Sequence, residues 1–297
     1  MDDILINMRR EHDFLVCVDS DGCAFDTMSL KQEKCFYTAT EEIWELKAVS
    51  RYARETALFV NLYSATRGIN RYPALVRTLR LLAKRPEAVA LGYRCPDLSP
   101  LEKWIDTTSS LSLGALEAYM RSLDHDEPVL EKTVRWVQKV DGNIRRLVQD
   151  LPPFDHVREA LERFSAFADI VVVSTATHED LTREWGDHGL LRYVSAVAGQ
   201  ELGPKALCIQ KANSGHYPED HTLMIGDSPA DYQAARKAGA LFYPILAGRE
   251  AESWKYACTD ISDAFRNGVY AGSKMESALA VFNQQLLKDP PWAELRS

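Results

Sequence analysis

Two carboxylates, Asp19 and Asp21, stand two positions apart directly after the apolar run Phe14–Val18. A short, continuous apolar run is typical of a strand buried on both faces. Because Asp tolerates turn geometry, both acids could simply lead the chain into a turn at Gly22. The alternative is chemical, since paired carboxylates can act as nucleophile and general acid/base or hold a cation. The choice depends on which groups the fold brings to the same strand end.

Two later apolar runs also end in polar residues. Ile170–Val173 is followed by Ser174 and Thr175, and Thr222–Ile225 is followed by Gly226 and Asp227. Ligands of open parallel sheets bind beyond the carboxyl ends of the strands. We therefore expect these side chains to converge with the first acidic pair.

Lys205 and Asp231 flank the third of these runs, and both also have an ordinary interpretation. A lone lysine is usually solvated on the surface. Ser228, Pro229 and Asp231 form the pattern of a capping box at the start of a helix. These roles do not explain why several acids would crowd at adjacent strand ends, where like charges repel unless a cation or a reaction compensates them.

The order of predicted elements indicates an α/β fold with one insertion. Further apolar runs occur at Leu241–Ile245 and, more weakly, at Tyr193–Val197, with helical periodicity between the runs. Strands that alternate with helices predict a parallel sheet with helices on both faces. Residues 30–150 are instead mostly helical in period. We predict a core domain of residues 1–29 and 151–297 and an inserted all-helical domain of residues 30–150.

Composition excludes several classes of protein. The 297 residues carry a formal net charge of −8, which disfavours general binding to nucleic acid. No apolar run is long enough to span a bilayer, and the first residues, MDDILINMRREHDF, lack the pattern of a signal peptide. We expect a cytoplasmic protein with neither a membrane nor a nucleic acid as partner. The oligomeric state is left open.

The sequence resembles the haloacid dehalogenase-like (HAD) hydrolase superfamily. The resemblance depends on motifs in the expected order: Asp-x-Asp-Gly after a strand, a strand ending in Ser-Thr, a lysine, and Gly-Asp-x-x-x-Asp before an Ala-rich helix. The long insert after the first motif resembles the helical C1 cap of phosphoglycolate phosphatase-like and β-phosphoglucomutase-like members. The resemblance implies a Rossmann-like core and identifies the inserted domain as a cap.

The family's catalytic roles follow from the resemblance, residue by residue. Asp19 matches the nucleophile that forms an aspartyl-phosphate, and Asp21 matches the general acid/base. Mg²⁺ would be held by Asp19, the backbone carbonyl of Asp21 and Asp227, with Asp231 supporting the metal site. Cys23 stands where the family usually has Thr.

The resemblance also implies a phosphate-binding set. Ser174 and Thr175, with backbone N–H groups at the start of the following helix, would bind phosphate oxygens. Lys205 would neutralise charge on both the phosphate and the nucleophile.

The expected function is a Mg²⁺-dependent phosphatase that hydrolyses a small phosphorylated metabolite. One alternative is a phosphomutase that shields the aspartyl-phosphate from water. A phosphonatase would need a Schiff-base lysine in the cap, such as Lys34 or Lys47. The last alternative is a non-catalytic regulatory or partner-binding protein on the same fold.

A candidate substrate-binding loop lies in the cap at Ser64–Pro73. It carries Arg67 and Arg71 within Lys47–Arg94, a segment with ten basic and two acidic residues. We hypothesise that the two arginines bind an anionic part of the substrate, because planar guanidinium groups suit carboxylate or phosphate. The other interpretation is that they are surface charges or pair with the acidic body.

Overall fold

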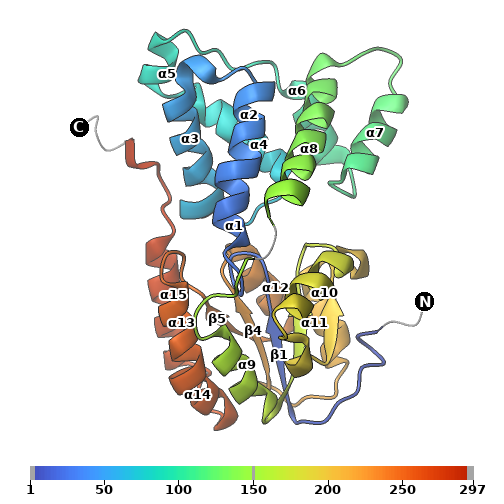
Figure 1. Ribbon diagram of the computed structural model, residues 1–297, viewed down its shortest axis with the longest axis vertical. Coiled ribbons are helices and arrows are strands. Elements are labelled where there is room, and N and C mark those ends of the chain that lie inside the picture. Colours follow the sequence, from blue (N-terminus) through green and yellow to red (C-terminus); the bar gives the residue numbers. More distant parts are fainter. Residues whose placement is uncertain (1–3, 149–150, 293–297) are drawn as a thin grey trace. The chain divides into compact units, whose positions relative to one another are not determined.

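The computed structural model describes residues 4–148 and 151–292. The chain divides into two compact units (Figure 1). The core consists of Met1–Met28 and Asp150–Leu286, and the cap consists of Ser29–Gln149 and Leu287–Ser297. The sequence prediction assigned all of residues 151–297 to the core, whereas the structure groups the segment after Leu286 with the cap.

The core contains a parallel five-stranded sheet with the order β3-β2-β1-β4-β5, which confirms the predicted fold class. Its strands are β1 (Phe14–Val18), β2 (Ala168–Val173), β3 (Ala196–Ala198), β4 (Thr222–Gly226) and β5 (Leu241–Pro244). The weakest predicted strand starts later than expected, because residues 191–193 form a 3-10 turn instead.

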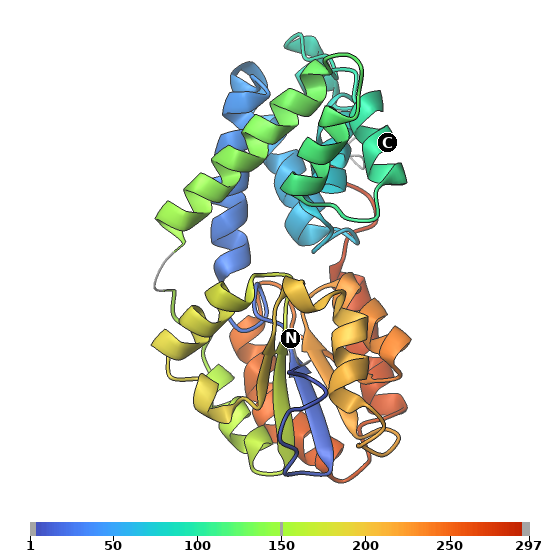
Figure 2. The ribbon, with the colours of Figure 1, turned by 90° about the vertical axis from the view of Figure 1, so that its right-hand side faces the viewer.

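Helices cover both faces of the sheet, as Figure 2 shows. They are α9 (Val157–Ser165), α10 (His178–Asp187), α11 (Lys205–Asn213), α12 (Pro229–Ala238), α13 (Glu250–Tyr256), α14 (Ser262–Arg266) and α15 (Ser273–Gln285). Side chains of β1 alternate between the two faces. Val16 and Val18 pack with α9, α10, α13 and α14, while Leu15 and Cys17 pack with α11, α12 and α15. Burial on both faces explains why the strands are continuous apolar runs.

The cap is all-helical and has its own buried core. Its helices are α2 (Tyr37–Ile43), α3 (Ser50–Leu58), α4 (Arg71–Leu82), α5 (Pro86–Ala90), α6 (Ser99–Thr107), α7 (Leu113–Arg121) and α8 (Pro128–Leu147), and the short α1 (Thr27–Leu30) spans the boundary between the units. Trp104 and Trp136 are fully buried, and the Trp136 indole donates to the Thr40 hydroxyl at 2.9 Å. Large aromatic side chains thus supply much of the cap's apolar core.

Within the described residues, we find no helix with both the length and the apolar character needed to cross a bilayer.

Candidate active site

The turn after β1 holds Asp19 at the carboxyl edge of the sheet. The Asp19 N–H donates to the Ile225 carbonyl at 3.0 Å, so the ladder with β4 continues to this residue. The Ser20 carbonyl then accepts three successive backbone N–H groups, from residues 23, 24 and 25. Gly22 has φ of +76°, a left-handed conformation that suits glycine. The Asp-x-Asp-Gly pattern therefore builds a tight turn as well as supplying two acids.

Lys205, the first residue of α11, is buried against two of the acids. Its Nζ lies 2.8 Å from Asp19 Oδ1 and 2.6 Å from Asp231 Oδ1. The exposed side-chain fractions are 11% for Lys205, 6% for Asp19 and 0% for Asp231. The ordinary interpretation of Lys205 as a solvated lysine is therefore wrong. Charge-assisted pairs in such a buried setting are shielded little by water or salt.

Asp231 also completes the predicted capping box at the start of α12. Its Oδ2 accepts from the Ser228 N–H at 3.1 Å and from the Ser228 hydroxyl at 2.6 Å. Gly226 packs directly beneath it, and a Cβ at this position would lie 2.5 Å from the Cβ of Asp231. Residue 226 must therefore be glycine for Asp231 to occupy its place. Sequence reasoning missed this role, although the Gly-Asp pair was a signal for it.

Asp19, Asp227 and Asp231 form a compact group of carboxylates. One oxygen from each lies within 4.8 Å of the others, and all three residues are buried. Lys205 compensates only one of the three negative charges. A buried group of hard oxygen ligands with excess negative charge fits a divalent cation such as Mg²⁺. These residues therefore fit the predicted metal site.

The pKa shifts of Asp19 and Lys205 agree with a site in which the acids outnumber the single lysine. Burial raises the pKa of the Asp19 carboxyl well above its usual value, and Asp231 and Asp227 raise it further against the lowering effect of Lys205. Burial alone would lower the pKa of the Lys205 ammonium, but Asp19 and Asp231 raise it overall. The lysine is therefore charged, and added positive charge near Asp19 would favour its carboxylate form.

Asp21 follows Ser20 in the same turn and is half-buried. Its carboxylate accepts a hydrogen bond from the Thr27 hydroxyl, and its backbone bridges to Phe25. Its carboxyl oxygens do not belong to the group formed by Asp19, Asp227 and Asp231. The Thr27 contact orients the carboxyl group of the predicted acid/base.

Ser174 and Thr175 follow β2 at the same edge of the sheet. Val18 pairs with Val172, so β1 and β2 end side by side. Ser174 is buried, and its hydroxyl accepts the N–H of Ala176 at 3.3 Å, whereas Thr175 is exposed. The structure thus places Ser174 next to the strand that ends in Asp19.

Sequence reasoning did not select Ser20, yet this residue ties the β1 turn to α10. Its hydroxyl donates to Glu184 Oε2 at 3.2 Å and accepts from Trp185 Nε1 at 3.0 Å. No pattern in the sequence pointed to these contacts, because they join positions 164 and 165 residues apart.

Both candidate arginines of the cap have partners within the cap. Arg71 Nη1 lies 2.6 Å from Asp141 Oδ1, and its guanidinium lies 5.4 Å from the centre of the Phe36 ring. Arg67 is buried, with 4% of its surface exposed, and its Nη1 donates to the Leu62 carbonyl at 3.1 Å. The pairing of Arg71 agrees with the second interpretation, although its acid belongs to the cap.

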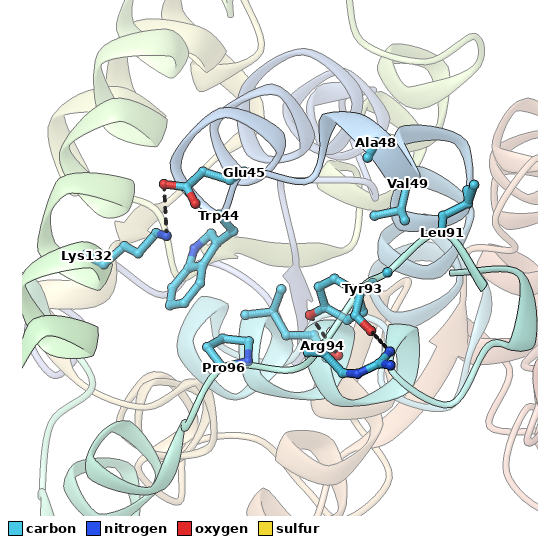
Figure 3. A pocket seen from close by; sticks show the side chains of 11 residues that line it. Trp44, Glu45, Ala48, Val49, Leu91, Tyr93, Arg94, Pro96 and Lys132 are labelled. Carbon is cyan, nitrogen blue, oxygen red and sulfur yellow. Dashed lines mark hydrogen bonds and ion pairs between the residues drawn. The ribbon is translucent and has the colours of Figure 1, made fainter. Parts of the chain in front are cut away.

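A cavity of about 300 Å³ occurs in the cap (Figure 3). Its lining residues are Trp44, Glu45, Ala48, Val49, Leu79, Leu91, Gly92, Tyr93, Arg94, Pro96 and Lys132. Several of its polar groups have partners in the walls, whereas the buried Trp44 Nε1 has no hydrogen-bond partner among the described residues. Lys132 lies 3.6 Å from Glu45, the Tyr93 hydroxyl donates to a backbone carbonyl at 3.2 Å, and Arg94 donates to the Tyr93 carbonyl at 2.9 Å. None of the residues predicted to do chemistry lines this cavity.

Comparison with known proteins gives one family match. The sequence model of the family described as haloacid dehalogenase-like hydrolase matches residues 75–244. This range contains Ser174, Lys205, Asp227 and Asp231, while Asp19 and Asp21 lie before it. No curated protein is similar enough in sequence to count as a match.

Among solved structures, the chain is similar to a haloacid dehalogenase-like family hydrolase from Streptococcus pneumoniae. The two sequences are 13% identical and the TM-score is 0.45, and the match covers 82% of this chain and 90% of that one. A HAD-superfamily hydrolase from Ehrlichia chaffeensis has 14% identity and a TM-score of 0.41, with coverage of 84% of this chain and 98% of that one.

Proposed function

The chain belongs to the haloacid dehalogenase-like hydrolase family, and on that premise we propose that it is a Mg²⁺-dependent phosphatase that acts on phosphate esters. Its substrate would be a small phosphorylated metabolite. The observation that carries the proposal is the buried contact of Lys205 with Asp19 and Asp231, beside Asp227, at the carboxyl edge of the sheet.

Asp19 is the proposed nucleophile. Its Oδ1 accepts from the Ser20 N–H at 2.8 Å and contacts Lys205, whereas Oδ2 accepts no hydrogen bond from the described residues. Oδ2 is therefore the oxygen that can attack phosphorus. A carboxylate approaches a phosphate dianion only where the charges of both are offset. Lys205 supplies part of that compensation, and Mg²⁺ bound by Asp19, Asp227 and the Asp21 carbonyl would supply the remainder.

Asp21 is the proposed general acid and base. In the first step, the bond from Asp19 Oδ2 to phosphorus forms, the ester P–O bond breaks, and Asp21 gives its proton to the leaving oxygen. In the second step, Asp21 takes a proton from water as the water oxygen attacks phosphorus, and Asp19 leaves as a carboxylate. The Thr27 hydroxyl holds the Asp21 carboxyl in place for both transfers.

Ser174, Thr175 and Lys205 form the proposed phosphate-binding set. Thr177 caps α10, whose first N–H groups follow Ser174 closely in the chain. Backbone N–H groups at a helix N-terminus suit the non-reacting oxygens of a phosphate. Asp231 accepts from Lys205 at Oδ1 and from the Ser228 hydroxyl at Oδ2. It would therefore orient the lysine and support the metal site.

In the cap, Arg67 and Arg71 are proposed to contact an anionic part of the substrate. Both arginines already have partners in the cap, Asp141 for Arg71 and the Leu62 carbonyl for Arg67, so contact with the substrate would compete with these bonds. Measuring KM for the best substrate after Arg67→Ala and after Arg71→Ala tests this assignment. Unchanged KM values in both variants would remove it.

The test of the proposed function is release of inorganic phosphate from a panel of phosphoesters, with Mg²⁺ and with EDTA. We expect one or a few substrates to be hydrolysed, and hydrolysis to stop when the metal is removed. The Asp19→Asn variant is the control for contaminating phosphatases. Isomerisation of a sugar phosphate without phosphate release, or activity that survives EDTA, would contradict the proposal.

A further inference from the structure

The segment after α15 leaves the core and packs on the cap. Leu286 is buried in the core against the same cluster as Phe282 of α15, and the next residue, Leu287, belongs to the cap. The chain therefore passes between the two units a third time, after the passages at 28–29 and 149–150. We call residues 287–292 the tail; it is the red segment after α15 in Figure 1.

The first anchor of the tail is a backbone bridge to the loop that carries Arg67. The Leu287 N–H donates to the Tyr63 carbonyl at 2.9 Å, and the Ala65 N–H donates to the Leu287 carbonyl at 3.1 Å. These two bonds pair Leu287 with Ser64 in parallel. Such a bridge is too short to be stable alone, and water competes for it, because 40% of Leu287 and 52% of Tyr63 are exposed.

The second anchor is the Trp292 ring, five residues further on. It lies edge to face with Phe59, with ring centres 5.5 Å apart, and the Arg85 guanidinium lies 4.1 Å from the centre of the Trp292 ring. Arg85 is buried and contacts the Tyr52 ring on another side at 4.8 Å. Trp292 therefore packs over a buried cation, a contact that is stronger than the same contact in water.

The residues between Leu287 and Trp292 help both anchors to contact the cap at the same time. Pro290 and Pro291 precede Trp292 and restrict the backbone, so less conformational entropy is lost when the tail binds. On the cap side, the loop beyond the bridge is internally bonded. Ser64 and Thr66 share a hydrogen bond of 2.7 Å, and the Arg67 N–H donates to the Ser64 carbonyl at 2.9 Å. Fixing Ser64 thus fixes the backbone that presents Arg67.

We propose that the tail is a strap, fastened by Trp292, that holds the Tyr63–Arg67 loop in place and thereby sets the enzyme's affinity for its substrate. The link to affinity rests on the proposed function, in which Arg67 contacts an anionic part of the substrate. Trp292 is a positioning residue, because it contacts the loop's support and not the reacting atoms. Its loss therefore changes KM and leaves the chemistry of the core residues intact.

The experiment compares Trp292→Ala with Trp292→Phe and with Lys288→Ala, an exposed residue of the same tail. Hydrogen exchange is measured over residues 63–67 and 287 of the full-length protein. We expect exchange in Trp292→Ala to be faster by about tenfold, the scale of one aromatic and one cation–π contact. Trp292→Phe should restore part of the protection, and Lys288→Ala should match the unmodified protein.

The same three variants are then assayed with the best phosphoester. We expect KM to rise by up to about tenfold in Trp292→Ala, with kcat within about twofold of the unmodified enzyme. Unchanged hydrogen exchange would overturn the strap, and faster exchange with unchanged KM would overturn its link to substrate affinity. If the unmodified protein hydrolyses no phosphoester, the proposed function fails, and the exchange measurement alone decides whether the strap exists.

Discussion

Two buried carboxylates lie at opposite ends of the sheet, and their surroundings differ. Asp169, near the start of β2, accepts hydrogen bonds from the Glu11 N–H at 3.1 Å, the His12 N–H at 3.3 Å and the Tyr217 hydroxyl at 2.9 Å. Asp19, after the end of β1, lies instead among two further acids and one lysine. Both are at least nine-tenths buried.

The comparison shows that burial of an acid does not by itself indicate function. Around Asp169, donors from the backbone and side chains replace the lost hydration, so the carboxylate stabilises the fold. Around Asp19, neighbouring carboxylates add repulsion that the fold alone does not relieve. A site that retains unfavourable charge indicates a ligand or a reaction that compensates it. Substitutions at the carboxyl end of the sheet should therefore change activity, and those at the amino end should change stability.

The largest expected effect is on turnover in Asp19→Asn. The amide cannot form the aspartyl-phosphate, so we expect kcat to fall by more than about 1000-fold. Stability should not fall, because the substitution removes a buried like charge and keeps an oxygen for the Ser20 N–H. Steady-state kinetics and thermal melts of the same preparation check both statements. Retained turnover would mean that another residue is the nucleophile.

We expect Mg²⁺ to stabilise the protein by binding at the carboxyl end of the sheet, beside Asp19 and Asp227, and not near Asp169. Mg²⁺ at about 100 times its Kd should add about 2.7 kcal/mol to the free energy of unfolding. Because burial raises the pKa of Asp19, its carboxyl holds a proton to higher pH in the metal-free protein than in the unfolded chain. The cation must displace that proton at low pH, so the stabilisation should be smaller at pH 5 than at pH 8.

Thermal melts with and without Mg²⁺ measure this effect. Asp227→Asn should abolish the stabilisation, and Asp169→Asn should retain it. A similar gain in both variants would place the metal elsewhere on the protein.

The sequence predicted the acidic end of the sheet better than the other end, for a physical reason. Asp19 and Asp227 each follow an apolar run, and parallel strands bring their carboxyl ends to one edge. Lys205 was selected for its place before the Thr222–Ile225 run, but its role beside Asp19 came from the family resemblance, because only tertiary packing brings the start of α11 to Asp19. Asp169 was missed, since its partners are distant in the chain. The tail was assigned to the wrong unit, because a short segment carries no signal of the surface on which it packs.

Asp231 combines features of the two carboxylates and should have an intermediate effect. Like Asp169, it accepts hydrogen bonds from fixed donors, and like Asp19, it contacts Lys205. We expect Asp231→Asn to lower kcat/KM by about 10- to 100-fold through misplacement of the lysine and the metal. The matched control is Ser112→Ala, which removes the N-cap of α7 in the cap and should cost about 1 kcal/mol of stability with little loss of activity. Equal losses of activity in both variants would assign Asp231 a capping role only.

The smallest effect on catalysis is expected at Asp169. In Asp169→Asn, an amide N–H₂ group replaces one carboxylate oxygen. This group cannot accept from the N–H groups of Glu11 and His12 or from the Tyr217 hydroxyl, so at least one of these hydrogen bonds is lost. We expect a decrease of about 1–2 kcal/mol in the free energy of unfolding, measured by urea titration. Because Asp169 lies at the amino end of β2 and the proposed chemistry at the carboxyl end, kcat and KM should be unchanged well below the melting temperature. A fall in kcat without a loss of stability would mean that the two ends of the sheet are coupled, and the contrast between a stabilising and a reactive carboxylate would then be wrong.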